Sequence, residues 1–323
     1  MLAALLLVWF GSPPEWAPLA LDTMRNNPEI TWLIFSDQGQ EAWYGDPLNV
    51  PTREERRERD NIRFYTLNAS SFVSLARRTT GIDATLKGGY KLCDWRMAFG
   101  EVFAHWLRRF AFWGWVDLDV FLGRLSHFGV NSSGLEGYDA LGEQSWPIQG
   151  PLTFLRNEPR LNQLWRRIPR AAERLQQPGI TRMNEWDFGR ALLSERKIRR
   201  RPVNFPMHLS AGERHGDADI ALIHGRVLHL PSCGEAAYFH FSKWKAAVAQ
   251  TAPGVIRSRD GEIAWIVGPS GVRPLEAVEW SRATECLEQA TGRFAWDVDR
   301  GLTPEKAYSG FKPRVTGLQG TLA

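Results

Sequence analysis

Three short apolar runs constrain the fold of this chain more than any other feature of its sequence. They cover residues 2–10, 30–35 and 112–116, and each ends at Gly, Ser or Asp. Runs of this length without a polar face are typical of strands buried on both sides of a parallel sheet. Residues 15–26 and 70–79, which lie between the runs, have the apolar spacing of helices. We therefore predict an α/β fold in which helices flank a mixed, mostly parallel sheet.

Weaker signals extend this pattern along the chain. We predict that Ser70 caps its helix and that one long helix covers residues 94–110. The charged run 53–60 is interpreted as a solvated surface insertion. Further strands are predicted at 61–67, 152–155, 227–230, 237–241 and 263–267, and further helices at 159–168 and 274–290.

The sequence changes character after Pro253, where Gly-rich segments replace the apolar runs. We therefore divide the chain into a first domain over 1–250 and an appended C-terminal module over 251–323, whose role the sequence does not indicate.

The composition is that of an ordinary globular protein. Of the 323 residues, 43% are hydrophobic and 24% are charged, which excludes disordered, collagen-like and coiled-coil chains. The net charge of +4 permits peripheral contact with phosphates or with the anionic inner face of a membrane, without requiring either. Basic residues alternate with acidic ones, so nucleic-acid binding is not indicated. The 15 tryptophans are expected mainly to fill the core, although indoles also stack on sugars.

The cysteines and the first residues bear on location. Cys93, Cys233 and Cys286 lie far apart without metal-ligand spacing, so we expect reduced thiols in a reducing compartment. The apolar run at the start has no basic residue before Arg25 and is too short to span a bilayer. We therefore interpret it as a buried first strand, and we predict a soluble, cytoplasmic protein.

The end of the third apolar run carries the strongest chemical signal. Asp117 and Asp119 follow the strand FWGWV and are two residues apart, so in an extended chain their carboxylates point the same way. Ligands of open parallel sheets bind outside the carboxyl ends of the strands. Burying two acids there is costly without a cation, and oxygen ligands suit Mg²⁺ or Mn²⁺. We therefore predict a divalent metal site at this position.

His240 ends a later apolar strand, and Lys243 and Lys245 follow it closely. A neutral imidazole would complete the metal site, and a lysine would neutralise a diphosphate as a point charge. The competing interpretation is a histidine with a purely structural role.

Two further polar segments each allow two interpretations. Lys91 and Asp94 flank a predicted helix start, where anions are favoured, but Asp94 is equally well explained as a cap. Glu185 and Asp187 either bind sugar hydroxyls and supply a catalytic base, or complement the dipole of the helix that they begin.

Taken in order, several segments of the chain resemble a bacterial family of poorly characterised proteins with the GT-A glycosyltransferase fold. These segments are YKLCDWRMAFGEVF, FWGWVDLDVFLG, GPLTFLRN, NEWDFG and YFHFSKWK, and the resemblance covers residues 1–250. More distantly, the chain is similar to retaining transferases of the glycogenin and lipooligosaccharide type. The resemblance implies that residues 1–250 form a nucleotide-sugar-binding catalytic domain. It implies an enzyme of polysaccharide biosynthesis that moves a hexose from a nucleoside-diphosphate sugar, expected to be a UDP-sugar, to a glycan or glycolipid acceptor.

The same resemblance implies roles for individual residues. Asp117, Asp119 and His240 would bind Mn²⁺ or Mg²⁺, and Glu185 and Asp187 would lie in an acidic catalytic segment at the sugar. That segment usually holds two adjacent acids in such transferases, whereas this chain has Asn-Glu there. The residues implied to bind the donor nucleotide and its diphosphate are Phe10, Gly11, Asp37, Lys91, Asp94 and Lys243.

Two other functions remain open on the sequence alone. A phosphohydrolase of the haloacid-dehalogenase type also places D-x-D after an apolar strand, and Asp117 would then be its nucleophile. Such a motif is expected near the start of a chain, whereas more than a hundred residues precede it here. The other alternative is a catalytically inactive protein that binds nucleotides or carbohydrates.

Overall fold

The computed structural model of the chain describes residues 2–45, 61–143, 148, 150–183, 185–195, 198–203, 208–210, 220–254 and 264–289. The predicted surface insertion at 53–60, Asn184 and the end of the predicted C-terminal module lie outside these residues.

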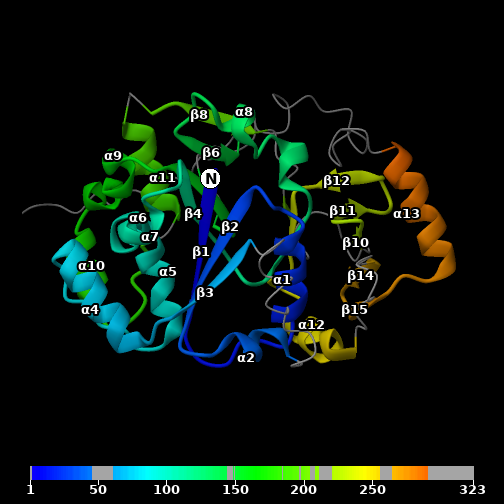
Figure 1. Cartoon of the computed structure of the whole chain (residues 1–323), viewed down its shortest axis with the longest axis horizontal. Helices are drawn as coiled ribbons and strands as arrows, with labels where there is room; N and C mark the ends of the chain where they lie inside the picture. The colour runs from blue at the N-terminus through cyan, green and yellow to red at the C-terminus, as the bar shows by residue number, and fades with distance from the viewer. Residues whose placement is uncertain are drawn as a thin grey trace, which may run out of the picture.

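A seven-stranded sheet with the order β3-β2-β1-β4-β7-β6-β8 forms the centre of the molecule (Figure 1). β1, β2, β3 and β4 are parallel, whereas β7 is antiparallel to both of its neighbours. The prediction of a mixed, mostly parallel sheet flanked by helices is thus confirmed. Its strands are β1 (Ala3–Trp9), β2 (Ile30–Ser36), β3 (Ile62–Thr66), β4 (Phe112–Val116), β6 (Ala140–Glu143), β7 (Leu152–Arg156) and β8 (Arg200–Val203).

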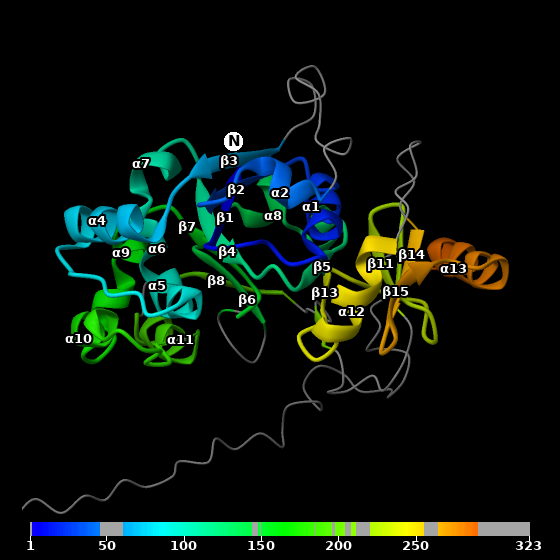
Figure 2. The ribbon, with the colours of Figure 1, turned by 90° about the horizontal axis from the view of Figure 1, so that it is seen from below.

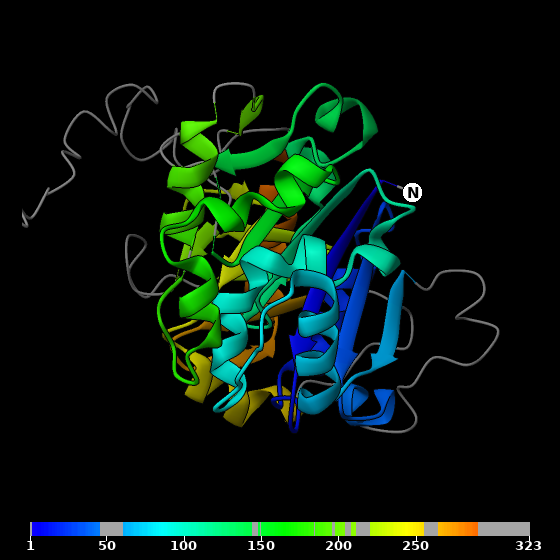
Figure 3. The same cartoon turned by 90° about the vertical axis from the view of Figure 1, so that its left-hand side faces the viewer.

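Both faces of this sheet are covered, which explains why the central strands lack a polar side. Along β1, Leu5 and Leu7 belong to the core on the side of α1 (Ala17–Arg25), whereas Leu6 belongs to the core on the side of α4 (Ala69–Thr80). Figure 3 looks onto that second helical layer. The helices are α1 (Ala17–Arg25), α2 (Gln40–Tyr44), α4 (Ala69–Thr80), α5 (Leu92–Trp95), α6 (Phe99–Val102), α7 (Ala104–Leu107), α8 (Ser132–Leu135), α9 (Pro159–Asn162), α10 (Ala171–Gln176) and α11 (Glu185–Ser194).

Tryptophan fills much of this core, as its abundance predicts. Fully buried indoles lie on both faces of the sheet and on the helices that cover these faces. They are Trp32, Trp43, Trp95, Trp113, Trp115 and Trp165.

Two local predictions are wrong. The N-cap of α4 is Asn68 rather than Ser70, because the Asn68 side chain accepts a hydrogen bond from the Ser71 amide at 2.8 Å. Residues 94–110 do not form one helix but a succession of short α and 3-10 turns. Met97, Ala98 and Phe99 are consecutive and all buried. The segment therefore packs on several sides, whereas a single straight helix with one apolar face would leave one of them exposed.

β4 and β7 lie so close together at Gly114 that no side chain fits there. A Cβ at this position would lie 1.6 Å from the Thr153 carbonyl oxygen. We expect Gly114→Ala to lower the free energy of unfolding by about 3 kcal/mol, because the two strands must separate. Denaturant unfolding measures this loss. Gly179→Ala is the control, since a Cβ there meets nothing within 4 Å; equal effects of the two substitutions would contradict the prediction.

A second, five-stranded sheet with the order β12-β11-β10-β14-β15 lies to one side of the first (Figure 2). Because β10 pairs with β14, strands from both sides of residue 250 share this sheet, and the predicted domain boundary cuts through it. Its elements are β10 (Ile220–Ile223), β11 (Arg226–His229), β12 (Gly234–Ala236), β14 (Ala264–Gly268) and β15 (Gly271–Pro274), with α12 (Lys245–Thr251) and α13 (Ala277–Gln289).

A disulfide between Cys233 and Cys286 ties α13 to this sheet, and Cys93 is a free thiol. The prediction of three reduced thiols is therefore wrong for this pair, because pairing across the fold is not visible in sequence spacing. Since disulfides persist mainly in oxidising compartments, the cysteines no longer support a cytoplasmic location. Among the residues that the structure describes, no helix is both long and apolar enough to cross a membrane.

Candidate functional site: an acid-histidine pocket at the carboxyl edge of the sheet

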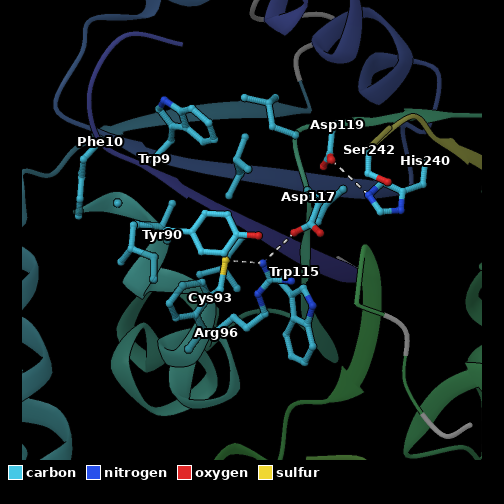
Figure 4. Close-up of a pocket in the computed structure, with 18 of the residues that line it drawn as sticks. Trp9, Phe10, Tyr90, Cys93, Arg96, Trp115, Asp117, Asp119, His240 and Ser242 are labelled. Atoms are coloured by element: carbon cyan, nitrogen blue, oxygen red, sulfur yellow. Dashed lines mark hydrogen bonds and ion pairs between the residues drawn. The ribbon is translucent and has the colours of Figure 1, made fainter. Parts of the chain in front are cut away.

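A pocket of about 500 Å³ opens where β1 and β4 end (Figure 4). β1 and β4 are neighbours, but the chain leaves β1 toward β2 on one side and reaches β4 only after β3. In open α/β sheets, such a reversal of strand order leaves a crevice in which ligands bind. The pocket is lined by Leu6, Leu7, Val8, Trp9, Phe10, Trp16, Gly89, Tyr90, Leu92, Cys93, Arg96, Phe99, Trp115, Val116, Asp117, Leu118, Asp119, His240, Ser242 and Lys245.

The backbone that follows β4 holds the two acids in place. The Asp117 amide donates to the Pro151 carbonyl at 2.8 Å, and the Trp16 indole donates to the Leu118 carbonyl at 3.1 Å. Asp117 and Asp119 therefore both line the pocket, as their spacing predicts.

Strand pairing brings His240 to the acids from far along the chain. β13 (Tyr238–His240) pairs antiparallel with β5 (Val120–Leu122), and this register sets His240 opposite Val120. Its Nε2 lies 3.2 Å from Oδ2 of Asp119. One ligand atom from each of Asp117, Asp119 and His240 lies within 4.8 Å of the others. The structure thus brings together the three residues that the sequence predicted as metal ligands.

Each acid also has a basic partner that the sequence analysis did not assign to the site. Nη2 of Arg96 lies 2.9 Å from Oδ1 of Asp117, and Nζ of Lys245 lies 2.7 Å from Oδ2 of Asp119. Lys243, which was predicted to bind a diphosphate, does not line the pocket. Lys245 lines the pocket and begins α12, which residues 241–244 separate from the end of β13. The position of that helix start is the signal that would have distinguished the two lysines.

These contacts determine the charge of Asp119. Burial acts to raise the pKa of its carboxyl, but the hydrogen bonds and charges of His240 and Lys245 outweigh burial and lower that pKa to about 2. Asp119 is consequently ionised at neutral pH. Its contribution to folding stability is complete above the ordinary pKa of an aspartate and is lost only as the pH falls toward 2.

The end of β1 shapes the other side of the pocket. Phe10 lines the pocket, and the Gly11 amide donates to Oδ1 of Asp37 at 2.8 Å. Gly11 has a φ of 90°, which favours glycine. Tyr90 is 71% exposed, and its hydroxyl points toward Asp117 (Figure 4). That Phe10, Gly11 and Asp37 bind a nucleotide remains a prediction.

Lys91 and Asp94 lie behind the pocket rather than on its surface. Both side chains are buried, and Nζ of Lys91 lies 2.8 Å from Oδ2 of Asp94. Asp94 also accepts hydrogen bonds from the amides of Thr181 and Met183. In this structure the pair therefore fastens the chain before α11 to the turns that line the pocket, and the binding of the donor by either residue remains a prediction.

Of the two predicted catalytic acids, the structure describes the side chain of Asp187 and places it away from the pocket. Asp187 lies on α11 and forms an ion pair with Arg174 at 2.8 Å. Glu185 begins α11, but its side chain lies outside the described residues. Asp187 does not line the pocket, and the catalytic role of both residues remains a prediction.

The donor set of the pocket fits a divalent cation. Two carboxylates and an imidazole are ligands that Mn²⁺ accepts, and Asp119 is held in its charged, ligating form. The pocket also leaves room for further ligands such as water or phosphate oxygens.

The fold and this pocket define an α/β protein with a candidate cation site at the carboxyl edge of a mostly parallel sheet. Residues 5–199, more than half of the chain, match a family of unknown function, DUF6625. The chain therefore belongs to this family. No curated protein matches it.

Two solved structures are weakly similar to the chain. Mouse xyloside xylosyltransferase 1 in its apo form has a TM-score of 0.41 and 10% identity, over 75% of this chain and 97% of that one. The PaToxG glycosyltransferase has a TM-score of 0.32 and 13% identity, over 60% of this chain and 68% of that one.

Proposed function

We propose that the protein is a metal-dependent glycosyltransferase that uses a nucleoside-diphosphate sugar, with a UDP-sugar as the expected donor. The observation that carries this proposal is the convergence of Asp117, Asp119 and His240 in a pocket at the strand ends. A divalent ion bound there would neutralise the negative charge that develops on the departing diphosphate.

Side chains around the acids suit the other parts of such a donor. Lys245 and Arg96 bring two positive charges into the pocket, so we assign the diphosphate contact to Lys245 instead of Lys243. Trp9, Phe10 and Tyr90 provide aromatic faces on which a base or sugar ring stacks. The role of these residues is to bind and orient the donor and to exclude water from it.

The acids of the pocket favour a transfer that retains the anomeric configuration. Among its described lining residues, Asp117 and Asp119 are the only carboxylates, and both belong to the proposed metal site. None of the other lining residues that the structure describes is a carboxylate that could serve as a base for attack from the opposite face. Attack from the face of the departing diphosphate needs no such residue, which supports retention of a transferred hexose.

The acceptor is proposed to be a glycan or a glycolipid. Tyr90 of the pocket lining is exposed, and Ile180 and Trp186 are exposed on the chain around the start of α11. Hydrogen bonds from Lys87 to Pro178 and from Thr181 to Asp94 hold these segments together. Rings and apolar groups of this kind suit sugar faces, and they would also support peripheral contact with a membrane that carries a lipid-linked acceptor.

Incubation of the protein with UDP-sugars and Mn²⁺ tests the proposal. We expect Mn²⁺-dependent release of UDP, which EDTA abolishes and which a suitable glycan acceptor accelerates. A generic aryl phosphate is the control substrate. Hydrolysis of the aryl phosphate without turnover of any UDP-sugar would favour a phosphohydrolase, and UDP binding without turnover would favour an inactive binding protein.

A further inference from the structure

The charged side chains that line the pocket cancel one another. They are two acids, Asp117 and Asp119, and two bases, Arg96 and Lys245. Each base contacts one acid, at 2.9 Å for Arg96 and at 2.7 Å for Lys245. The pocket is therefore already neutral without any bound ion, so a divalent cation does not enter an uncompensated acidic site.

Lys245 occupies the position in which a cation would ligate Asp119. Its Nζ and the Nε2 of His240 both contact the same oxygen, Oδ2 of Asp119. A divalent ion held by Asp119 and His240 must approach this oxygen to about 2 Å, from the side on which the ammonium group lies. The ammonium and the ion repel each other and cannot share the position.

The surroundings of the two bases indicate which of them moves. Arg96 is 15% exposed and donates to the Gly150 carbonyl at 2.9 Å and to the Cys93 sulfur at 3.1 Å. The Lys245 side chain is 46% exposed on a flexible stem at the start of α12. Lys245 can thus swing away from Asp119 at little cost, whereas Arg96 is fastened in place.

We propose that Lys245 is a built-in competitor of the divalent cation. Without an ion, Lys245 neutralises Asp119; when an ion binds, Lys245 is displaced and its charge becomes available to an anion in the same pocket. The bound ion then leaves the lining with two uncompensated positive charges, which favours a diphosphate. The inference deepens the proposed function and rests on it for the identity of this anion, but the competition with the ion stands independently.

Isothermal titration of the full chain with MnCl₂ alone tests the competition. We expect Lys245→Met to bind Mn²⁺ about tenfold more tightly than the wild type, because the competing charge is gone. Lys245→Arg keeps a competing cation and should bind Mn²⁺ no more tightly than the wild type. Lys87→Met is the matched control, since this exposed lysine lies outside the pocket lining and its loss changes the net charge equally.

Titration with UDP at saturating Mn²⁺ gives the second half of the test. Here Lys245→Met should bind about tenfold more weakly than the wild type, because the displaced lysine no longer meets the anion. This opposite sign separates competition from a merely structural role, which would weaken both ligands. Circular dichroism establishes that each variant is folded, and Lys245→Gln provides a second neutral variant.

The outcomes distinguish this inference from the proposed function. The competition would be overturned if Lys245→Met bound Mn²⁺ no more tightly than the wild type. It would also be overturned if neither protein bound Mn²⁺. Tighter Mn²⁺ binding by Lys245→Met together with no UDP-sugar turnover would support the competition and contradict the glycosyltransferase proposal. If the wild type turned over UDP-sugars but Lys245→Met bound Mn²⁺ as the wild type does, the glycosyltransferase proposal would be supported and the competition contradicted.

Discussion

Replacing Asp119 with asparagine is expected to lower the Mn²⁺-dependent affinity for UDP by about a hundredfold, or about 2.7 kcal/mol. Asp119 is 7% exposed, and its Oδ2 contacts both His240 and Lys245. An amide has nearly the same shape but no charge, so a divalent ion loses its buried anionic ligand. Titration calorimetry with UDP, with and without Mn²⁺, measures the loss.

The same substitution should leave the fold intact. Lys245 is half-exposed and can turn to solvent when its partner loses its charge, so no cation is left buried and unpaired. Asp83→Asn is a suitable control, because that acid is exposed and pairs with Arg77 on the surface. Unchanged UDP affinity in Asp119→Asn, with Mn²⁺ present, would remove the metal site from the proposed function.

Local sequence patterns predict those strands and site residues that depend on local interactions. β1, β2 and β4 follow from their apolar runs, since a strand buried on both faces has no polar side. The two acids follow from their position at the end of β4, because the carboxyl edge of a parallel sheet is where ligands bind.

Long-range pairing determines the rest, and spacing does not encode it. The five-stranded sheet joins β10 to β14, which lie on opposite sides of residue 250, and the disulfide links cysteines 53 residues apart. A shift of one or two residues in the start of α12 decides whether Lys243 or Lys245 reaches Asp119. Boundaries of this kind are the least certain part of a sequence-based prediction.

Replacing Asp94 with asparagine is expected to lower the free energy of unfolding by about 3–5 kcal/mol. Asp94 and Lys91 are both buried, and the ammonium of Lys91 also donates to the Arg174 carbonyl at 2.8 Å. The asparagine leaves that ammonium buried without a counter-charge, which a protein interior tolerates poorly. Denaturant unfolding followed by circular dichroism measures the change.

The double variant Lys91→Met, Asp94→Asn is the informative comparison, because removal of both charges should recover most of the stability lost in the single variant. The double variant also separates the two roles proposed for Asp94, which are to fasten the chain before α11 and to contact the donor. If Asp94 acts by fastening Thr181 and Met183 ahead of α11, donor binding and stability should fall and recover together. If Asp94 instead touches the donor, Asp94→Asn would weaken UDP-sugar binding while its stability stays within about 1 kcal/mol of the wild type, since an exposed contact at a ligand costs little in folding. The burial of the pair favours the first outcome.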